Sequence, residues 1–132
     1  MKAQKATSFL PAEIVLNPRW WHQTAGIIFD KDFYFDAQTR EKNDILMRRV
    51  LFERFGEYGF GEEFPQTRPV IGSMHVAGGF VIPALLGAEI RFEADAAPQP
   101  LPLQWSMAQI EQFERPDFKN CWPMKQLIAS MD

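Results

Sequence analysis

The stretch DAQTREKNDILMRRVLFERFG, residues 36–56, carries the strongest structural signal in the sequence. Its apolar residues recur at helical spacing and form one broad face: Ile45, Leu46, Val50, Leu51, Phe52 and Phe55. Asp36 can cap the start of the helix, because its carboxylate accepts a hydrogen bond from a first-turn N–H group. Gly56 can end the helix in the left-handed conformation. The pattern predicts a helix over 37–55, whose arginines lie on a solvent-exposed face.

Shorter elements are predicted on the C-terminal side of this helix. The stretch PVIGSMHV, 69–76, is interpreted as a short buried strand, and GGFVIPALLG, 78–87, as a short helix with Pro83 in its first turn. In AEIRFE, 88–93, Ile90 and Phe92 alternate with charged residues, which is typical of a strand with one wet face.

Two more helices are predicted further along the chain. Ser106 and Gln109 have the spacing of a capping box, which would start a helix that runs to about Phe113. Pro123 opens a last helix, in which an apolar stripe recurs at helical spacing: Met124, Leu127, Ile128 and Met131. This stripe needs an apolar surface to cover it, supplied either by an earlier part of the chain or by another polypeptide.

The composition disfavours several classes of protein. The 132 residues suit one domain, and a net charge of −3 disfavours binding to nucleic acid. The single cysteine, Cys121, excludes an internal disulfide framework and a zinc cage built from cysteines. The longest mostly apolar run, 76–88, is shorter than the roughly 20 residues that span a bilayer. Residues 1–17 form a lead-in segment without the apolar core of a signal peptide. We therefore expect a cytoplasmic protein with no membrane partner.

Two segments resemble the uroporphyrinogen decarboxylases. In PRWWHQTAG, 18–26, four residues match the family's opening Pro-x-Trp-x-x-x-Gln-Ala-Gly segment: Pro18, Trp20, Ala25 and Gly26. Further along, FVIPALLGAEIRFEADAAPQP, 80–100, is similar to the family's apolar-Pro-x-x-Leu-Gly segment and the strand and turn that follow it. Corrinoid and coenzyme M methyltransferases share this framework. The resemblance implies that 18–132 is an α/β domain, the N-terminal portion of a (β/α)8 barrel. The barrel would be incomplete in this chain, because such a barrel needs about 250 residues.

The sequence departs from the decarboxylases at their substrate-binding charges. The family's two opening arginines correspond here to Gln23 and Ile27, and an aspartate that precedes the Leu-Gly pair corresponds to Gly78. An amide and an isoleucine cannot form the bidentate charge-assisted bonds that suit a polycarboxylate. We therefore expect no decarboxylation of uroporphyrinogen. The resemblance instead favours the methyltransferase branch, whose zinc ligands come from a later part of the barrel.

Two histidines are the candidate catalytic residues. On the resemblance, His22 lies at the C-terminal end of the first barrel strand and His75 at the end of the second, and this end of a barrel carries the chemistry. Either imidazole could donate a proton or act as a ligand. The alternatives are that His22 is packed among aromatic rings and that His75 is a hydrogen-bonded core residue. A zinc site that joins both histidines to Cys121 is disfavoured, because Cys121 precedes a helix away from the barrel mouth.

The aromatic residues of 20–34 are candidates for substrate binding. Trp20, Trp21, Phe29, Phe33 and Tyr34 could line a pocket for a planar substrate. Of these, Trp20, Trp21 and Tyr34, together with Gln23, are our candidate binding residues. The alternative is a hydrophobic plug at the bottom of the barrel or a surface that faces a partner. Glu62 and Glu63 are interpreted as solvated loop charges.

The resemblance implies part of a methyltransferase that moves a methyl group between a small methylated substrate and a corrinoid or thiol acceptor. A second hypothesis is a non-catalytic subunit that completes or regulates a larger enzyme, with its aromatic residues as interface anchors. A third is a decarboxylase of a non-porphyrin acid. A partial barrel leaves sheet edges and a half-built core to be covered. We therefore expect a hetero-oligomer with another polypeptide or the remainder of the barrel. No cofactor is expected on this chain alone, and a corrinoid or zinc is expected in the complete assembly.

Overall fold

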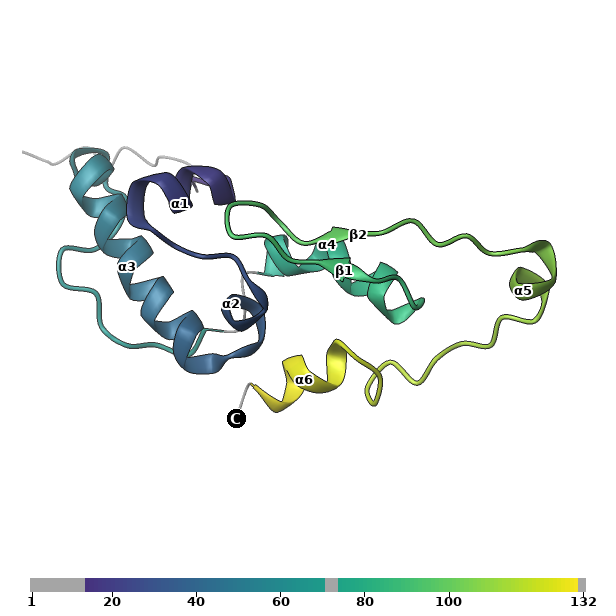
Figure 1. Ribbon diagram of the computed structural model, residues 1–132. Coiled ribbons are helices and arrows are strands. Elements are labelled where there is room, and N and C mark those ends of the chain that lie inside the picture. The colour runs from purple at the N-terminus through teal and green to yellow at the C-terminus, as the bar shows by residue number, and fades with distance from the viewer. Residues whose placement is uncertain (1–13, 71–73, 131–132) are drawn as a thin grey trace, which may run out of the picture.

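The structure, a computed structural model, describes residues 14–70 and 74–130. Within these ranges helices predominate, and each strand is only two residues long (Figure 1). The elements follow in the order α1 (Pro18–Ala25), α2 (Lys31–Phe35), α3 (Ala37–Phe55), the 3-10 helix η1 (Gly56–Tyr58), α4 (Met74–Leu85), β1 (Ile90–Arg91), β2 (Gln99–Pro100), α5 (Met107–Glu111) and α6 (Met124–Ala129). The fold is a small mixed one, with helices and a single two-stranded pairing among the described residues.

The elements form a helical end and an extended arm (Figure 1). Helices α1, α2 and α3 lie together, and the β1–β2 hairpin lies beside α4. After β2 the chain runs out to α5 and returns to α6, which contacts α2. The two strands are antiparallel, with Ile90 opposite Pro100. They are therefore not the parallel pair that a (β/α)8 barrel contains. None of the described helices is long and apolar enough to cross a membrane.

Helix α3 begins and ends at the predicted residues, Ala37 and Phe55. The Asp36 carboxylate accepts a hydrogen bond from the backbone N–H of Thr39 at 2.7 Å, which confirms the predicted cap. A further hydrogen bond from the Thr39 hydroxyl is the main cause of the lowered pKa of Asp36. The C-terminal end differs from the prediction. Gly56 is right-handed and continues into η1, and Gly59, with φ of 86°, is the left-handed residue.

Residues 18–25 form helix α1, and the first barrel strand expected there is wrong. The side chain of Asn17 accepts a hydrogen bond from the backbone N–H of Trp20 at 2.8 Å, and Pro18 lies in the first turn, where its missing N–H is not needed. Gly26, with φ of 68°, ends the helix and donates its N–H to the carbonyl of His22. These local caps define a helix, whatever the strand preference of the aromatic residues between them.

The strand predicted over 69–76 is also wrong where the structure describes it. Pro69 and Val70 have no regular structure, residues 71–73 lie outside the described ranges, and α4 begins at Met74. Pro83 lies inside α4 and not in its first turn. A long run of apolar residues fits a buried helix as well as a buried strand, and its length favours the helix. Helix α4 ends soon after Pro83, whose carbonyl accepts the N–H of Ala88.

The hairpin follows the predicted alternation. Ile90 and Phe92 are half-buried, whereas the charged residues between and beside them are exposed: Glu89, Arg91 and Glu93. The hairpin is tied to the α1–α2 connection, because the backbone N–H of Phe29 donates to the carbonyl of Ala94 at 2.9 Å. The predicted strand with one solvent-exposed face is therefore confirmed, although regular strand geometry is limited to β1.

Both helices predicted near the end of the described chain are present. Ser106 and Gln109 form the complete capping box, and α5 ends at Glu111, before the predicted Phe113. Helix α6 starts directly after Pro123. Of its predicted apolar stripe, Met124 and Leu127 are half-buried and Ile128 is exposed, while Met131 lies outside the described residues.

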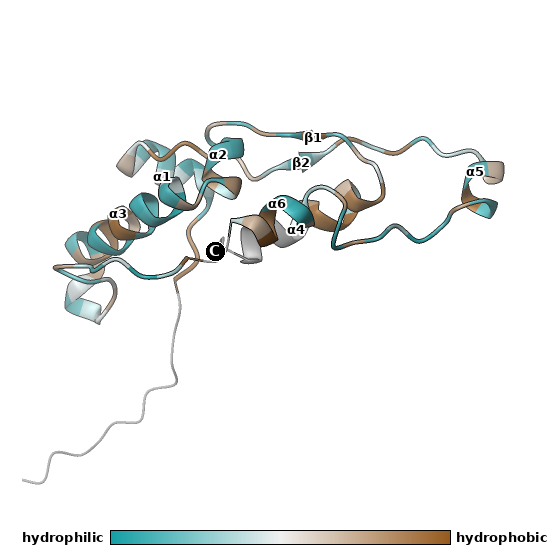
Figure 2. Cartoon of the chain, turned by 90° about the horizontal axis from the view of Figure 1, so that it is seen from below, coloured by the Kyte–Doolittle hydropathy of each residue, from teal (hydrophilic) through white to brown (hydrophobic). Residues whose placement is uncertain are grey.

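A triad of aromatic rings joins α2, α4 and the hairpin. Phe80 and Tyr34 are almost completely buried. The ring centroids of Tyr34, Phe80 and Phe92 lie 5.6–5.7 Å apart, and the Phe80 ring is nearly perpendicular to the other two. Such aromatic pairs contribute about 0.5–1.5 kcal/mol beyond the burial of their area. Figure 2 shows that the turns of α3, in contrast, alternate between polar and apolar residues.

Phe80→Ala should lower the free energy of unfolding by about 3–5 kcal/mol, because it removes a fully buried ring and leaves a cavity in the triad. Ile82→Ala, on the same helix with a side chain 67% exposed, should change it by less than about 0.5 kcal/mol. Urea unfolding followed by tryptophan fluorescence, in the assembly in which the chain is folded, measures both. Equal losses in the two variants would mean that α4 does not pack on this cluster.

Candidate functional site

A cavity of about 320 Å³ lies between α1, α3 and the segment that contains Arg68 and Val70. Apolar side chains form much of its wall: Leu16, Trp21, Phe29, Phe33, Met47 and Leu51. Polar side chains line the rest: Arg40, Asn43, Asp44, Arg48 and Arg68. Small-molecule pockets have volumes of about 300–1,000 Å³ and combine apolar walls with a few polar groups. The cavity has both properties and is the candidate binding site.

Arg48 lines the cavity with a side chain that is 9% exposed. Its Nε donates to Asp44 at 2.8 Å, its Nη1 to Glu62 at 2.7 Å, and its Nη2 to the carbonyl of Gln66 at 2.6 Å. The expectation of a solvated Arg48 is therefore wrong. Glu62 pairs with Arg48 but keeps a side chain that is 48% exposed, as expected for a solvated loop charge. The loop after α3 folds back along the helix and brings acceptors to it. Glu63 is exposed, as predicted.

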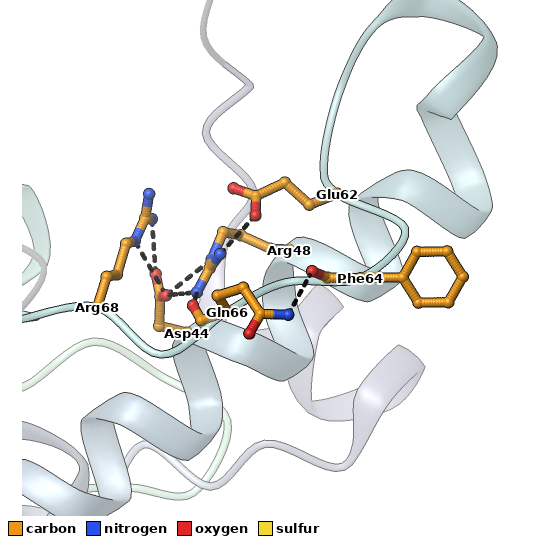
Figure 3. A network of polar contacts seen from close by, with 6 residues as sticks. All are labelled: Asp44, Arg48, Glu62, Phe64, Gln66 and Arg68. Atoms are coloured by element: carbon orange, nitrogen blue, oxygen red, sulfur yellow. Dashed lines mark hydrogen bonds and ion pairs between the residues drawn. The ribbon is translucent and has the colours of Figure 1, made fainter.

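Asp44 lies between the guanidinium groups of Arg48 and Arg68, as Figure 3 shows. Arg68 donates to its two carboxylate oxygens from Nε at 3.1 Å and from Nη2 at 2.8 Å. This hydrogen-bonded carboxylate raises the pKa of Arg68. The Asp44 side chain is 15% exposed and that of Arg48 is 9% exposed, so this pair is screened less than a surface pair. The Arg68 side chain, in contrast, is 55% exposed.

The loop reaches α3 through Gly61. Its φ of 75° is in the left-handed region, and a Cβ at this position would overlap the backbone of Phe52 and Arg48. The next residue, Glu62, donates its N–H to the carbonyl of Arg48 at 3.1 Å. Glycine is needed here for both reasons, and it allows the Glu62 carboxylate to meet the Arg48 guanidinium.

Arg40, 4% exposed, holds three separate segments together. Its Nη1 donates to the carbonyl of Tyr34 at 2.9 Å and its Nε to the carbonyl of Val70 at 3.1 Å. Its Nη2 donates to the carbonyl and the hydroxyl of Ser130 at 2.8 and 3.0 Å. Burial lowers the pKa of Arg40, and the charge of Asp36 partly opposes this effect. Arg40, like Arg48, is thus buried where the sequence pattern predicted a solvated arginine.

His22 is held by one hydrogen bond at the end of α1. Its Nδ1 lies 2.8 Å from the carbonyl oxygen of Ile27, and the side chain is half-buried. A carbonyl oxygen can only accept, so the proton of this bond is on Nδ1 and the neutral ring keeps its lone pair on Nε2. The bond fixes the ring orientation, which both the predicted chemical role and the alternative packing role would require.

The four predicted binding residues do not meet in one place. Trp21 lines the cavity. The ring of Trp20 packs edge-on against the ring of Trp21, with the two ring centroids 4.9 Å apart. Gln23 is exposed on α1. Tyr34 is buried in the aromatic triad, and its hydroxyl has no hydrogen-bond partner within the described part of the chain. Phe29 and Phe33, which the sequence also indicated, do line the cavity.

The other residues weighed from the sequence are not among the residues that line this cavity. His75 is in the first turn of α4, and its side chain lies outside the described residues. The strand end expected to carry it is therefore a helix start. Cys121 is half-buried ahead of α6, as expected, and is a free thiol. No group of three or more His, Cys, Asp or Glu side chains in the described ranges could hold a metal ion.

Sequence reasoning missed the polar half of the cavity. Arg40, Asp44 and Arg48 recur every four residues along α3, which is the one pattern that could have indicated a shared polar face. Their partners lie in distant segments and carry no local signal.

No family model, curated protein or solved structure matches the chain.

Arg48→Met should lower the free energy of unfolding by about 3 kcal/mol, because it leaves the mostly buried Asp44 carboxylate with only the exposed Arg68 as its partner and removes the hydrogen bonds to Glu62 and Gln66. Arg49→Met, at the exposed neighbouring position, should stay within about 0.5 kcal/mol of the parent. Denaturant unfolding of the two variants side by side is the measurement. A loss in Arg49→Met as large as in Arg48→Met would show that the network does not hold the loop.

Burial raises the pKa of the Tyr34 phenol above its ordinary value of 10.0. The folded state therefore holds this proton more tightly than the unfolded state, so stability is unaffected below about pH 10 and falls as the pH rises above it. Near pH 11 the folded parent and Tyr34→Phe should show the same tyrosinate absorbance, because Tyr34 keeps its proton in the folded protein. After unfolding in guanidinium, the parent should show about twice the absorbance of the variant. A difference before unfolding would place Tyr34 in contact with water.

Proposed function

We propose that this chain is part of a uroporphyrinogen-decarboxylase-like methyltransferase and forms the N-terminal portion of a (β/α)8 barrel. The proposed reaction moves a methyl group between a small methylated substrate and a corrinoid or thiol acceptor. The resemblance at 18–26 and 80–100 supports this proposal. The parallel strands of the barrel would come from further polypeptide, because the described residues contain only an antiparallel pair.

The observation that carries the proposal is the burial of Ile27. The resembled decarboxylases place an arginine at this position to hold a substrate carboxylate. Here Ile27 is 2% exposed and belongs to the hydrophobic core. Gln23, which corresponds to the other arginine of the resembled decarboxylases, is an exposed amide. Neither position supplies a cation, so α1 does not suit the binding of a polycarboxylate. The lack of a cation at these two positions also argues against a decarboxylase that would hold the carboxylate of a non-porphyrin acid there.

His22 is the proposed proton-transfer residue of this part of the enzyme. Its Nδ1–H is committed to the carbonyl of Ile27 at 2.8 Å, which leaves Nε2 as the atom that can accept and return a proton. A histidine fixed in one tautomer by a backbone carbonyl is also a common arrangement in metal sites. The described residues do not complete such a site, so zinc or a corrinoid would need ligands from elsewhere in the assembly.

The second candidate is a non-catalytic subunit, and the extended arm favours it. The arm carries exposed apolar side chains on and around α5: Leu103, Met107, Ile110 and Phe113. Two extended connections lead to and from α5 (Figure 1). Trp105 and Phe113 pack against each other with ring centroids 5.1 Å apart, but no residue of 101–113 belongs to the buried core cluster. Apolar surface of this kind is typical of a segment that another polypeptide covers.

Methyl transfer in the purified assembly tests the proposal. With cob(I)alamin and a panel of small methylated substrates, methylcobalamin should form, as followed by its visible spectrum. His22→Gln should lower this rate by about 10²-fold or more at an unchanged melting temperature, because it removes the proton-transfer group. Cys121→Ser should retain the parent rate, because that half-buried thiol lies just ahead of α6 and takes no part in the proposed proton transfer.

The same assays separate the alternatives. Release of carbon dioxide from uroporphyrinogen or another acid, without methylcobalamin, would replace the methyltransferase by a decarboxylase. Absence of both products in an assembly that contains the folded chain would favour the non-catalytic subunit. Loss of activity in Cys121→Ser alone would indicate that the Cys121 thiol, and not His22, takes part in the reaction.

A further inference from the structure

Arg40 brings an unbalanced positive charge to the cavity. Three of the lining side chains are arginines, and two of these pair with carboxylates: Arg48 with Asp44 and Glu62, and Arg68 with Asp44. Arg40 has no ion pair within 4.0 Å among the described residues. The three arginines, Asp44 and Glu62 together carry one positive charge in excess, and the charge of Asp36 acts on Arg40 only from beyond 4.0 Å. Proteins rarely bury a charged side chain without a partner of opposite charge.

The guanidinium group of Arg40 also retains hydrogen-bonding capacity. It makes four hydrogen bonds, all to neutral oxygen atoms of Tyr34, Val70 and Ser130. A guanidinium group has five N–H donors, so one N–H, on Nη1, has no acceptor in the described part of the chain. An anion placed there would supply both the missing acceptor and the missing negative charge.

The rest of the cavity wall suits an apolar body. Trp21, Phe29 and Phe33 contribute aromatic rings, and the rings of Phe29 and Phe33 lie 4.5 Å apart. Met47 and Leu51 add flexible and branched apolar side chains from α3. A volume of about 320 Å³ is enough for a molecule the size of a single substituted ring.

We propose that this cavity binds a small apolar monocarboxylate, with its carboxylate at Arg40 and its apolar body against Trp21, Phe29 and Phe33. One excess positive charge matches one carboxylate, which distinguishes this ligand from the polycarboxylates of the resembled decarboxylases. The proposal goes beyond methyl transfer and does not depend on it, because it concerns binding alone.

Calorimetric titration of the full chain, in the assembly in which it purifies, tests the proposal with benzoate as the probe. Benzamide has the same shape without the charge and is the matched control. Benzoate should bind at millimolar or lower concentration and at least about ten-fold more tightly than benzamide. Equal binding of the two would overturn the role of the charge. Absence of benzoate binding at millimolar concentration would overturn the site.

Variants locate the bound probe without disturbing Arg40, whose replacement would release three segments at once. Met47→Phe should fill the cavity and weaken benzoate binding by about ten-fold or more, whereas Leu46→Phe, at the exposed neighbouring position, should leave it unchanged. Unchanged binding in Met47→Phe, with the melting temperature maintained, would place the probe elsewhere and overturn the proposal.

Asp132→Asn removes the acidic residue that follows Ser130 most closely in the sequence. Benzoate binding should be unchanged in this variant, because the proposal assigns the charge of Arg40 to the ligand. Tighter binding would show that Asp132 is the natural counter-ion of Arg40 and would overturn the proposal.

Discussion

The N–H groups of Arg40 need acceptors because the guanidinium group is buried. Those acceptors come from Tyr34, Val70 and Ser130, so one side chain sets the positions of α2, the loop before α4 and the end of α6 relative to α3. Arg48, two turns along the same helix, holds the loop at Glu62 and Gln66 in the same way. The polar side of the cavity is therefore built from groups that also hold the fold together.

Elements defined by neighbouring residues could be predicted from the sequence. The Asp36 cap, the Ser106–Gln109 capping box and the alternation around Ile90 each depend on residues within a few positions, and the structure contains all three. Helix α1 was missed although its signals are equally local. Asn17 and Gly26 mark its two ends, but the family resemblance favoured a strand between them. In α4 the apolar run fits either kind of element, because it has no periodicity to distinguish them.

The site was predictable only in its apolar half. The aromatic residues Trp21, Phe29 and Phe33 were candidates by composition and line the cavity, but composition could not separate them from Tyr34, which packs in the core. The arginines of α3 were expected in solvent, because charge is usually exposed. Tyr34 and Asp44 are close to them in the sequence, but their other acceptors lie 14 to 90 residues away, and no local pattern reports such a distance.

The contact between Arg40 and Ser130 joins residues 90 positions apart and closes a loop that includes the whole extended arm. The entropy lost on closing a loop grows only with the logarithm of its length, at about 0.6 kcal/mol for each doubling. Lengthening or shortening the arm by several residues would therefore change the cost of this closure very little. Related chains could differ in the size and sequence of the arm, and so in what it contacts, while the packing of α6 on the helical end is preserved.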